Sequence, residues 1–244
     1  MNNVAIIIPS RLEAKRLPNK PLKLINNTEM ILHVHNSAVK AEQGSVYVAS
    51  PDEKIVNLIE KNGGRAILTS KDHSTGTDRV YEVFEKELKK GPEFIINLQG
   101  DMPNINPNAI RSLIHHIQKK TCDIATLASN LEKLDYLESN IVKVKTKTGI
   151  EKDFSEAVDF FRVSNQNLDG LTYHHVGIYA FTNKALVRYV GLNRSKLELE
   201  RKLEQLRALE NSMSIHVGYI NSSPLSVDTK NDLMEVRKIM ENRN

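Results

Sequence analysis

The chain of 244 residues has no tryptophan, one cysteine and an aromatic content of only 5%. A single cysteine excludes a disulfide within the chain and any zinc cluster built from several cysteines. We expect that residue, Cys122, to be small buried packing rather than a nucleophile. The scarcity of aromatic side chains argues against a base-stacking surface for single-stranded nucleic acid.

Long hydrophobic runs are also missing. The apolar run Val4–Ile8 near the start is far shorter than the roughly 20 residues of a membrane span, and no basic segment precedes it as in a signal peptide. We therefore expect a cytoplasmic protein without membrane insertion. The net charge of +4 suits small anionic substrates, and no basic block with interleaved aromatics predicts nucleic-acid binding.

Predicted strands and helices alternate along the first half of the chain. Apolar runs predict strands at 4–8, 45–49, 65–68 and 94–98, and amphipathic segments predict helices at 28–42, 51–62 and 77–90, with Thr28 and Ser50 as N-caps of the first two. This order predicts an α/β fold, a Rossmann-like, mostly parallel mixed sheet with helices on both faces.

The second half has a different pattern. We expect strands at 123–129, 141–146, 172–181 and 215–220, helices at 197–210 and 230–242, and an irregular stretch at 147–170. His115 and His116 fall on a further helix, and we expect both on its surface.

A basic loop rich in proline follows the first predicted strand, with the cations Arg11, Lys15, Arg16 and Lys20. Ligands of open α/β sheets bind just beyond the carboxyl ends of the strands. Arginine offers a planar fork to phosphate oxygens, and lysine a mobile charge. The loop therefore predicts a site for a polyanion such as a nucleoside triphosphate; the alternative is a solvated surface loop.

Two aspartates stand at sheet edges or helix starts. Gln99-Gly100-Asp101 directly follows the fourth strand, so the Asp101 carboxylate is expected near the basic loop, where it could bind Mg²⁺ or cap the helix near Pro107. Asp228 precedes the last predicted helix and by itself fits an N-cap.

Two further segments carry candidate residues. Ser74, Thr75, Gly76 and Arg79 lie where a strand leads into a helix, a position that favours an anion or a base edge, whereas His73 fits a loop hydrogen bond equally well. His175 and Tyr179, four residues apart, share one face of a strand. By themselves they fit ordinary half-buried residues.

Together these segments resemble the 3-deoxy-manno-octulosonate cytidylyltransferase (CMP-Kdo synthetase) family. The resemblance covers nearly the whole chain, is weakest at 147–170, and rests on Pro9-Ser10-Arg11, Arg16-Leu17-Pro18-Asn19-Lys20-Pro21-Leu22, Ser74–Arg79, Gln99-Gly100-Asp101-Met102-Pro103, His175-Val176-Gly177-Ile178-Tyr179, Leu203-Glu204-Gln205-Leu206-Arg207 and Val227-Asp228-Thr229.

The resemblance implies a fold of the nucleotide-diphospho-sugar transferase type, and we interpret 1–244 as one nucleotidyltransferase domain with a substrate-facing or dimerisation excursion at about 130–215. It implies transfer of a cytidylyl group from CTP to the anomeric hydroxyl of a 3-deoxy acid sugar (Kdo), giving CMP-Kdo and pyrophosphate for lipopolysaccharide synthesis. It also implies a homodimer.

Residue roles follow from the same resemblance. It implies catalytic roles for Arg11, Arg16, Lys20 and Asp101. It implies nucleotide binding by Ser10, Arg11, Arg16, Lys20, Ser74, Thr75, Gly76, Arg79 and Gln99, and sugar binding by Gln99, His175, Tyr179, Glu204 and Gln205. Asp101 and Asp228 would hold Mg²⁺.

The chain departs from the family pattern at Met102, where the family has glutamate, and at Glu156, where the family has an arginine that helps bind the acidic sugar. Glu156 keeps open a cytidylyltransferase for another acidic sugar, for example an amino-substituted one; Arg162 is the candidate replacement cation. A non-catalytic nucleotide-binding paralogue is a further alternative, although retention of both aspartates and the loop cations argues against it.

Overall fold

The computed structural model describes residues 3–14, 16–89, 91–132, 135–163 and 170–241. The chain divides into two compact units, unit 1 with residues 1–111 and 224–244 and unit 2 with residues 112–223. The predicted excursion at 130–215 falls within the range of unit 2, and the single-domain interpretation stays a prediction. Among the described helices, none combines the length and apolar character that crossing a bilayer requires.

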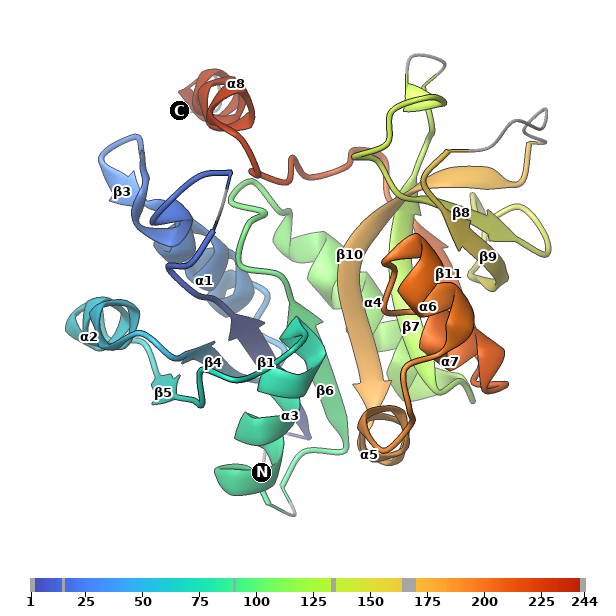
Figure 1. Ribbon diagram of the computed structural model, residues 1–244, viewed down its shortest axis with the longest axis horizontal. Helices are drawn as coiled ribbons and strands as arrows, with labels where there is room; N and C mark the ends of the chain where they lie inside the picture. Colours follow the sequence, from blue (N-terminus) through green and yellow to red (C-terminus); the bar gives the residue numbers. More distant parts are fainter. Residues whose placement is uncertain (1–2, 15, 90, 133–134, 164–169, 242–244) are drawn as a thin grey trace. The chain divides into compact units, whose positions relative to one another are not determined.

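The core of unit 1 is a parallel sheet. Its strands stand in the order β5 (Ala66–Leu68), β4 (Ser45–Ser50), β1 (Val4–Pro9) and β6 (Phe94–Leu98), as Figure 1 shows in the blue and green part of the chain. Every residue of β1 is buried, as expected for a central strand covered on both faces. All four predicted strands of the first half are confirmed.

Helices pack against this sheet. The helices that contact its strands are α1 (Met30–Lys40), α2 (Glu53–Lys61) and α3 (Gly76–Lys86). Two more helices belong wholly or partly to this unit: α4 (Pro107–Lys119) begins in it, and α8 (Lys230–Glu241) lies at the end of the described chain. Two predicted caps are wrong. Thr28 belongs to a short hairpin, β2 (Leu24–Ile25) with β3 (Thr28–Glu29), so that Glu29 is the N-cap of α1, and Ser50 ends β4, which leaves Asp52 as the N-cap of α2.

One hydrophobic cluster of unit 1 fixes the far end of the basic loop. Leu17 of that loop packs with Ile25, Met30 and residues at or near α8, among them the fully buried Val227. The backbone N–H of Val227 also donates to the carbonyl of Asp101, at 2.9 Å. Burial of these apolar side chains holds the loop next to the start of α8, and the hydrogen bond of Val227 adds the turn after β6 to them.

Unit 2 holds a mixed sheet in the order β10 (Thr172–Thr182), β7 (Ile124–Ser129), β11 (Ile215–Tyr219), β9 (Ser155–Phe161) and β8 (Lys143–Thr146). Strand β8 pairs with β10 as well as with β9, so the pairings form a closed ring. Only β7 with β11 is parallel among these pairs.

Two predictions for unit 2 are wrong. The supposedly irregular stretch at 147–170 contains β9, whose pattern is hidden because Val158 is apolar yet exposed. The helix predicted at 197–210 is two helices, α6 (Lys196–Arg201) and α7 (Leu206–Glu210), separated where Lys202 adopts a left-handed backbone with φ of 56°. Helix α5 (Asn183–Val190) was not foreseen.

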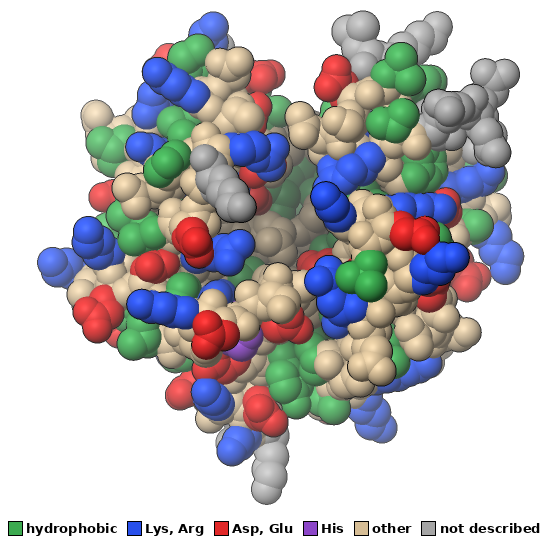
Figure 2. Space-filling model, viewed as in Figure 1, with side chains coloured by type: hydrophobic (Ala, Val, Ile, Leu, Met, Phe, Trp, Pro, Cys, Tyr) green, Lys and Arg blue, Asp and Glu red, His purple; other side chains and the backbone are tan. Residues whose placement is uncertain are grey.

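Figure 2 shows lysine and arginine side chains interspersed with aspartate and glutamate on one face of the molecule. The net charge of +4 therefore does not locate a binding site, and only a local group of like charges can indicate one.

Candidate functional site

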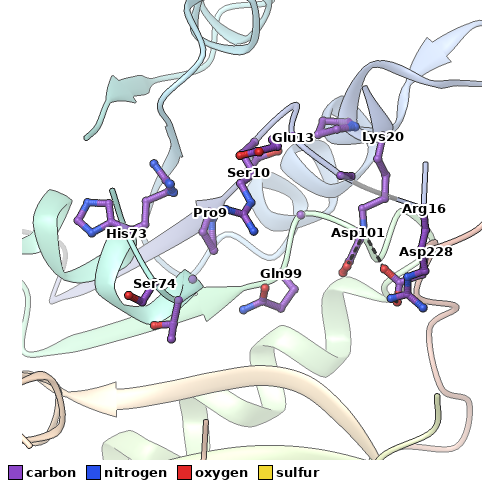
Figure 3. Close-up of a pocket in the computed structure, with 17 residues that line it drawn as sticks. Pro9, Ser10, Glu13, Arg16, Lys20, His73, Ser74, Gln99, Asp101 and Asp228 are labelled. Carbon is purple, nitrogen blue, oxygen red and sulfur yellow. Dashed lines mark hydrogen bonds and ion pairs between the residues drawn. The ribbon is translucent and has the colours of Figure 1, made fainter. Parts of the chain in front are cut away.

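Unit 1 contains a cavity of about 530 Å³ at the carboxyl ends of β1 and β6 (Figure 3). Its lining includes all the residues of this unit predicted for catalysis, nucleotide binding and metal binding, namely Ser10, Arg11, Arg16, Lys20, Ser74, Thr75, Gly76, Arg79, Gln99, Asp101 and Asp228. Lys15 lies outside the described residues. The volume is in the range of small-molecule sites, and the position agrees with ligand binding in open α/β sheets.

Lys20 joins the two aspartates. Its Nζ lies 3.0 Å from Oδ2 of Asp101 and 3.0 Å from Oδ1 of Asp228, while Arg16 Nη2 lies 3.0 Å from Oδ2 of Asp228. Figure 3 shows the lysine side chain extending toward both carboxylates. Burial by itself would lower the pKa of Lys20, but attraction from the two carboxylates outweighs it and raises the pKa above the ordinary value.

The cap of α8 is supplied by other residues than Asp228. Asp232 Oδ2 accepts hydrogen bonds from the backbone N–H groups of Asp228 and Thr229, and Thr229 Oγ1 accepts from the N–H of Asp232. The N-cap reading of Asp228 is therefore wrong, and its carboxylate faces Lys20 and Arg16 instead. Since one ammonium reaches both carboxylates, their oxygens also fit a hard divalent cation.

Ser10 and Gln99 line the cavity directly after the ends of β1 and β6. The Ser10 hydroxyl is buried and makes no hydrogen bond with the described residues, so it can serve a ligand. Gln99 Nε2 donates to Asn97 Oδ1 at 2.9 Å, which fixes the orientation of its amide. At Gly100 a Cβ would lie 3.1 Å from the carbonyl oxygen of Pro9, so the missing side chain allows the two turns to approach.

Thr75 and Arg79 shape the segment before α3. Thr75 is the N-cap of α3 in a reciprocal capping box with Asp78. Arg79 is 3% exposed, and its Nη1 donates to the Ser70 carbonyl at 2.8 Å and to the Thr69 hydroxyl. Burial, together with the nearby charge of Arg11, lowers the pKa of Arg79. Arg79 thus lines the cavity while it holds the loop 69–75 in place.

Glu82 anchors the same loop, a role that sequence reasoning missed because an acid on an amphipathic helix usually faces solvent. Its carboxylate accepts from the Ser70 N–H at 2.9 Å and from Lys86 Nζ at 2.6 Å, and contacts His73 Nε2 at 2.5 Å. Burial would raise the pKa of Glu82, yet these hydrogen bonds lower it to about 2. His73 is accordingly a loop hydrogen-bonding residue.

Unit 2 contains four of the residues predicted to bind the sugar. His175 and Tyr179, both buried on β10, have ring centroids 5.5 Å apart, which confirms their shared face. Burial lowers the pKa of His175 to about 3 and raises that of Tyr179, to which the Glu204 carboxylate also contributes. Glu204 and Gln205 lie at the break between α6 and α7, where the Tyr189 hydroxyl donates to the Glu204 carbonyl at 2.8 Å.

The departures from the family pattern have structural counterparts. Met102 is a buried core residue of unit 1. Glu156 is exposed on β9 and lies 3.4 Å from Lys147 Nζ. The guanidinium of Arg162 donates to the carbonyls of Ser139 and Asn140, at 3.0 and 3.2 Å.

Comparisons with known proteins agree with one another. A sequence model described as cytidylyltransferase matches residues 5–215. The 3-deoxy-manno-octulosonate cytidylyltransferase of Afipia carboxidovorans is 40% identical over 241 residues, which is 98% of this chain and 97% of that protein. That of Bartonella henselae is 40% identical over 237 residues, 96% of this chain and 97% of that protein.

Among solved structures, CMP:2-keto-3-deoxy-manno-octonic acid synthetase complexed with CTP matches with a TM-score of 0.90 and 33% identity, over 99% of each chain. A cytidylyltransferase from Leptospira borgpetersenii, 15% identical with a TM-score of 0.65 over 98% of this chain and 87% of that one, shows the fold alone. The predicted mixed α/β fold class is confirmed. Nucleotidyltransferases of this kind generally use a divalent metal.

Proposed function

Because the chain belongs to the 3-deoxy-manno-octulosonate cytidylyltransferase family and is thus a nucleotidyltransferase, we propose that it transfers the cytidylyl group of CTP to the anomeric hydroxyl of Kdo. The products are CMP-Kdo, the activated sugar for lipopolysaccharide synthesis, and pyrophosphate. The observation that carries this proposal is the cavity in which basic-loop cations stand next to the paired carboxylates of Asp101 and Asp228.

The triphosphate binds at the basic loop. Arg11, Arg16 and Lys20 line one cavity and carry positive charge toward the phosphate oxygens, and the buried Ser10 hydroxyl adds a donor. Ser74, Thr75, Gly76 and Gln99 lie on the same cavity and contact the nucleoside. Glu82 and Arg79 hold the loop 69–75 through hydrogen bonds to Ser70, so the loop residues that contact the nucleoside are in position before the nucleotide binds.

Asp101 and Asp228 would hold Mg²⁺. A bound magnesium ion would neutralise phosphate charge and lower the pKa of the attacking hydroxyl. In the absence of ligands Lys20 pairs with both carboxylates and Arg16 pairs with Asp228, so two positive charges balance two negative ones. Lys20 and Arg16 are therefore placed to exchange their carboxylate partners for phosphate oxygens when a nucleotide binds, and the two carboxylates would then be available to the ion.

The residues of unit 2 that contact the acidic sugar are His175, Tyr179, Glu204 and Gln205. The neutral state that burial imposes on His175 and Tyr179 suits them to hydrogen bonding rather than to charge neutralisation. Glu156 is engaged with Lys147 on an exposed strand position, so it gives no specific support to an amino-substituted sugar. The relatives named for Kdo favour that sugar, and activity in the relatives' family disfavours a non-catalytic paralogue.

The reaction forms one bond and breaks one. The anomeric oxygen attacks the α-phosphorus, the bond to the bridging α–β oxygen breaks, pyrophosphate leaves, and the hydroxyl proton passes to solvent. Transfer of this kind depends mainly on positioning and charge neutralisation. The chain's contribution is accordingly to orient the triphosphate through Arg11, Arg16 and Lys20 and to fix the carboxylates through the Val227–Asp101 backbone hydrogen bond.

We further propose that the protein is a homodimer in the cytoplasm, where CTP is available. Leu199 on α6 is apolar and 53% exposed, and it is a candidate for a subunit contact. Light scattering on the purified chain measures the assembly, and a monomeric mass would contradict the dimer.

Pyrophosphate release tests the function. The purified chain is incubated with Mg²⁺, CTP and either Kdo or an amino-substituted Kdo, with UTP and ATP as nucleotide controls. We expect release with CTP and Kdo, much slower release with the other combinations, and none in EDTA. Faster turnover of the amino sugar would contradict the proposed sugar, and binding of CTP without any turnover would favour the paralogue.

A further inference from the structure

Two histidines and the cysteine of the chain meet in unit 2, and none of them belongs to the residues proposed for the reaction. His116 lies near the end of α4, Cys122 in the turn before β7, and His216 on β11. His116 Nε2 is 2.9 Å from His216 Nδ1, and the ligand atoms of all three residues lie within 4.8 Å of one another. The predicted surface position of His116 is wrong: it is buried, as is Cys122, whereas His216 is partly accessible.

The surrounding structure holds these residues together by contacts of its own. Asp123, next to Cys122, accepts from the backbone N–H of Ser214 at 2.9 Å and donates its own N–H to the Ser214 hydroxyl at 2.9 Å. Ser214 is two residues from His216, so the cysteine and histidine segments are tied to each other. The cluster is thus built on the ends of rigid elements and does not depend on a mobile loop.

An aromatic ring fixes one histidine. Phe154 stacks on the His116 imidazole with centroids 3.6 Å apart and the rings within 7° of parallel. The ring occupies the space over Gly218 of β11, where a Cβ would lie 2.2 Å from Phe154 Cζ. The glycine therefore lets Phe154 cover β11 and limit the orientations open to His116.

The donor atoms match the preference of zinc. Zinc–nitrogen bonds of about 2.0–2.1 Å and a zinc–sulfur bond of about 2.3 Å at tetrahedral angles place neighbouring donors roughly 3.3–3.6 Å apart. The two imidazole nitrogens lie 2.9 Å apart and no pair of the three ligand atoms is separated by more than 4.8 Å, so small side-chain rotations bring all three atoms onto one ion. Imidazole and thiolate are softer donors than the oxygens of Asp101 and Asp228, and so the two sites select different metals.

We propose that His116, Cys122 and His216 bind one Zn²⁺ ion, with water in the fourth position on the accessible side of His216. On binding, the Cys122 thiol loses its proton to solvent. The hydrogen shared by the two imidazoles moves through solvent to the outer nitrogen of its ring, which frees both facing nitrogens as donors. The ion would pin the end of α4 to β11 and stabilise unit 2.

Cobalt reports on this site specifically. The full-length protein is stripped with a chelator and titrated with Co²⁺ while the near-ultraviolet spectrum is recorded. Because Cys122 is the chain's one cysteine, thiolate-to-cobalt charge-transfer absorption can arise nowhere else in it. We expect this band to saturate at one equivalent of Co²⁺ and to be abolished by one equivalent of Zn²⁺, including in an Asp101→Asn background that weakens the proposed magnesium site.

Variants assign the ligands. Cys122→Ser should remove the band, and His216→Asn should lower the affinity for Co²⁺ by about 10–100-fold or more. His115 is the exposed neighbour of His116 on the same helix, and His115→Gln should leave the charge-transfer band and the affinity for Co²⁺ unchanged. Absence of the band in the wild-type protein at saturating Co²⁺ would overturn the proposal and leave the histidines as a hydrogen-bonded pair. The proposal would also be overturned if His216→Asn, shown by circular dichroism to be folded, bound Co²⁺ with the affinity of the wild-type protein.

Discussion

Replacing Lys20 by methionine removes the ammonium that lies 3.0 Å from each of the Asp101 and Asp228 carboxylates. The two carboxylate oxygens are at most twice that distance apart, so in the metal-free variant two negative charges face each other without the ammonium between them, and Arg16 remains paired with Asp228 alone. Two unit charges about 6 Å apart repel by about 3 kcal/mol at an effective dielectric constant of about 20.

Solvent reduces that repulsion. The side chains of Asp101 and Asp228 are 25% and 38% exposed, so we expect Lys20→Met to lower the free energy of unfolding by about 2 kcal/mol in EDTA. The pKa of Lys20 is raised in the folded protein, so its contribution is fully present below its ordinary pKa of 10.5 and is lost as the pH rises through the folded value. Measurements near pH 7 therefore capture all of it.

The same substitution should favour metal. A divalent cation that takes the place of the ammonium relieves the repulsion, so the affinity of Lys20→Met for Mn²⁺ without nucleotide should rise by about 30-fold, the equivalent of about 2 kcal/mol. Turnover should nevertheless fall, because the variant lacks a cation for the triphosphate. Urea unfolding in EDTA and in excess Mg²⁺ measures the first effect, and paramagnetic resonance of Mn²⁺ the second.

Lys23→Met is the matched control, since it changes a lysine of the same segment that does not line the cavity. It should alter neither the stability nor the affinity for Mn²⁺. If Lys20→Met behaves like this control in both measurements, the carboxylates are not poised for a cation, and the exchange of partners proposed for Lys20 is refuted.

Four further substitutions test individual assignments. Asp101→Asn should lower kcat by about 10²–10³ with little loss of stability, and near-normal pyrophosphate release would remove Asp101 from the metal site. Arg16→Ala should weaken CTP binding by roughly 10–100-fold in calorimetry, since a charge-assisted hydrogen bond is lost; an unchanged affinity would return the loop to a solvated surface role. The pKa of Glu82 is lowered to about 2, so its stabilisation is present above about pH 4.5 and is lost as the pH falls toward 2. Glu82→Gln should therefore flatten the acid side of the stability profile and raise KM for CTP, and a profile like that of the wild type would refute the anchoring role. Glu156→Arg should leave the rate with Kdo unchanged, because the residue is exposed and paired with Lys147; a large gain would place position 156 in the sugar site.

Much of unit 1 follows from local sequence. The run Val4–Ile8 forms a strand buried on both faces because it offers no polar side, and the turn at Gly100 follows another predicted strand, β6. The basic loop was recognisable because prolines and cations were concentrated directly after a strand. Patterns within about ten residues carried this information, and the parallel order of the strands then determined which edge the loop occupies.

Local patterns failed where distant contacts override them. Strand β9 is stabilised by its pairing with β8 and β11, which compensates for the exposed Val158. The predicted continuous helix breaks at Lys202, although its leucines keep a helical spacing. Propensity is a weak guide at such positions because tertiary packing contributes more free energy than the choice of local conformation.

The sequence by itself determined which chemical groups the site contains: the loop cations, Asp101 and Asp228 could each be named from their local motifs. Only the tertiary structure decided their pairing. Lys20 meets carboxylates 81 and 208 residues away, and Glu82 holds the loop through Ser70, 12 residues before it. Such contacts arise because burial of residues like Leu17 and Val227 in one cluster brings their charged neighbours together, and the spacing of residues along a chain does not encode that packing.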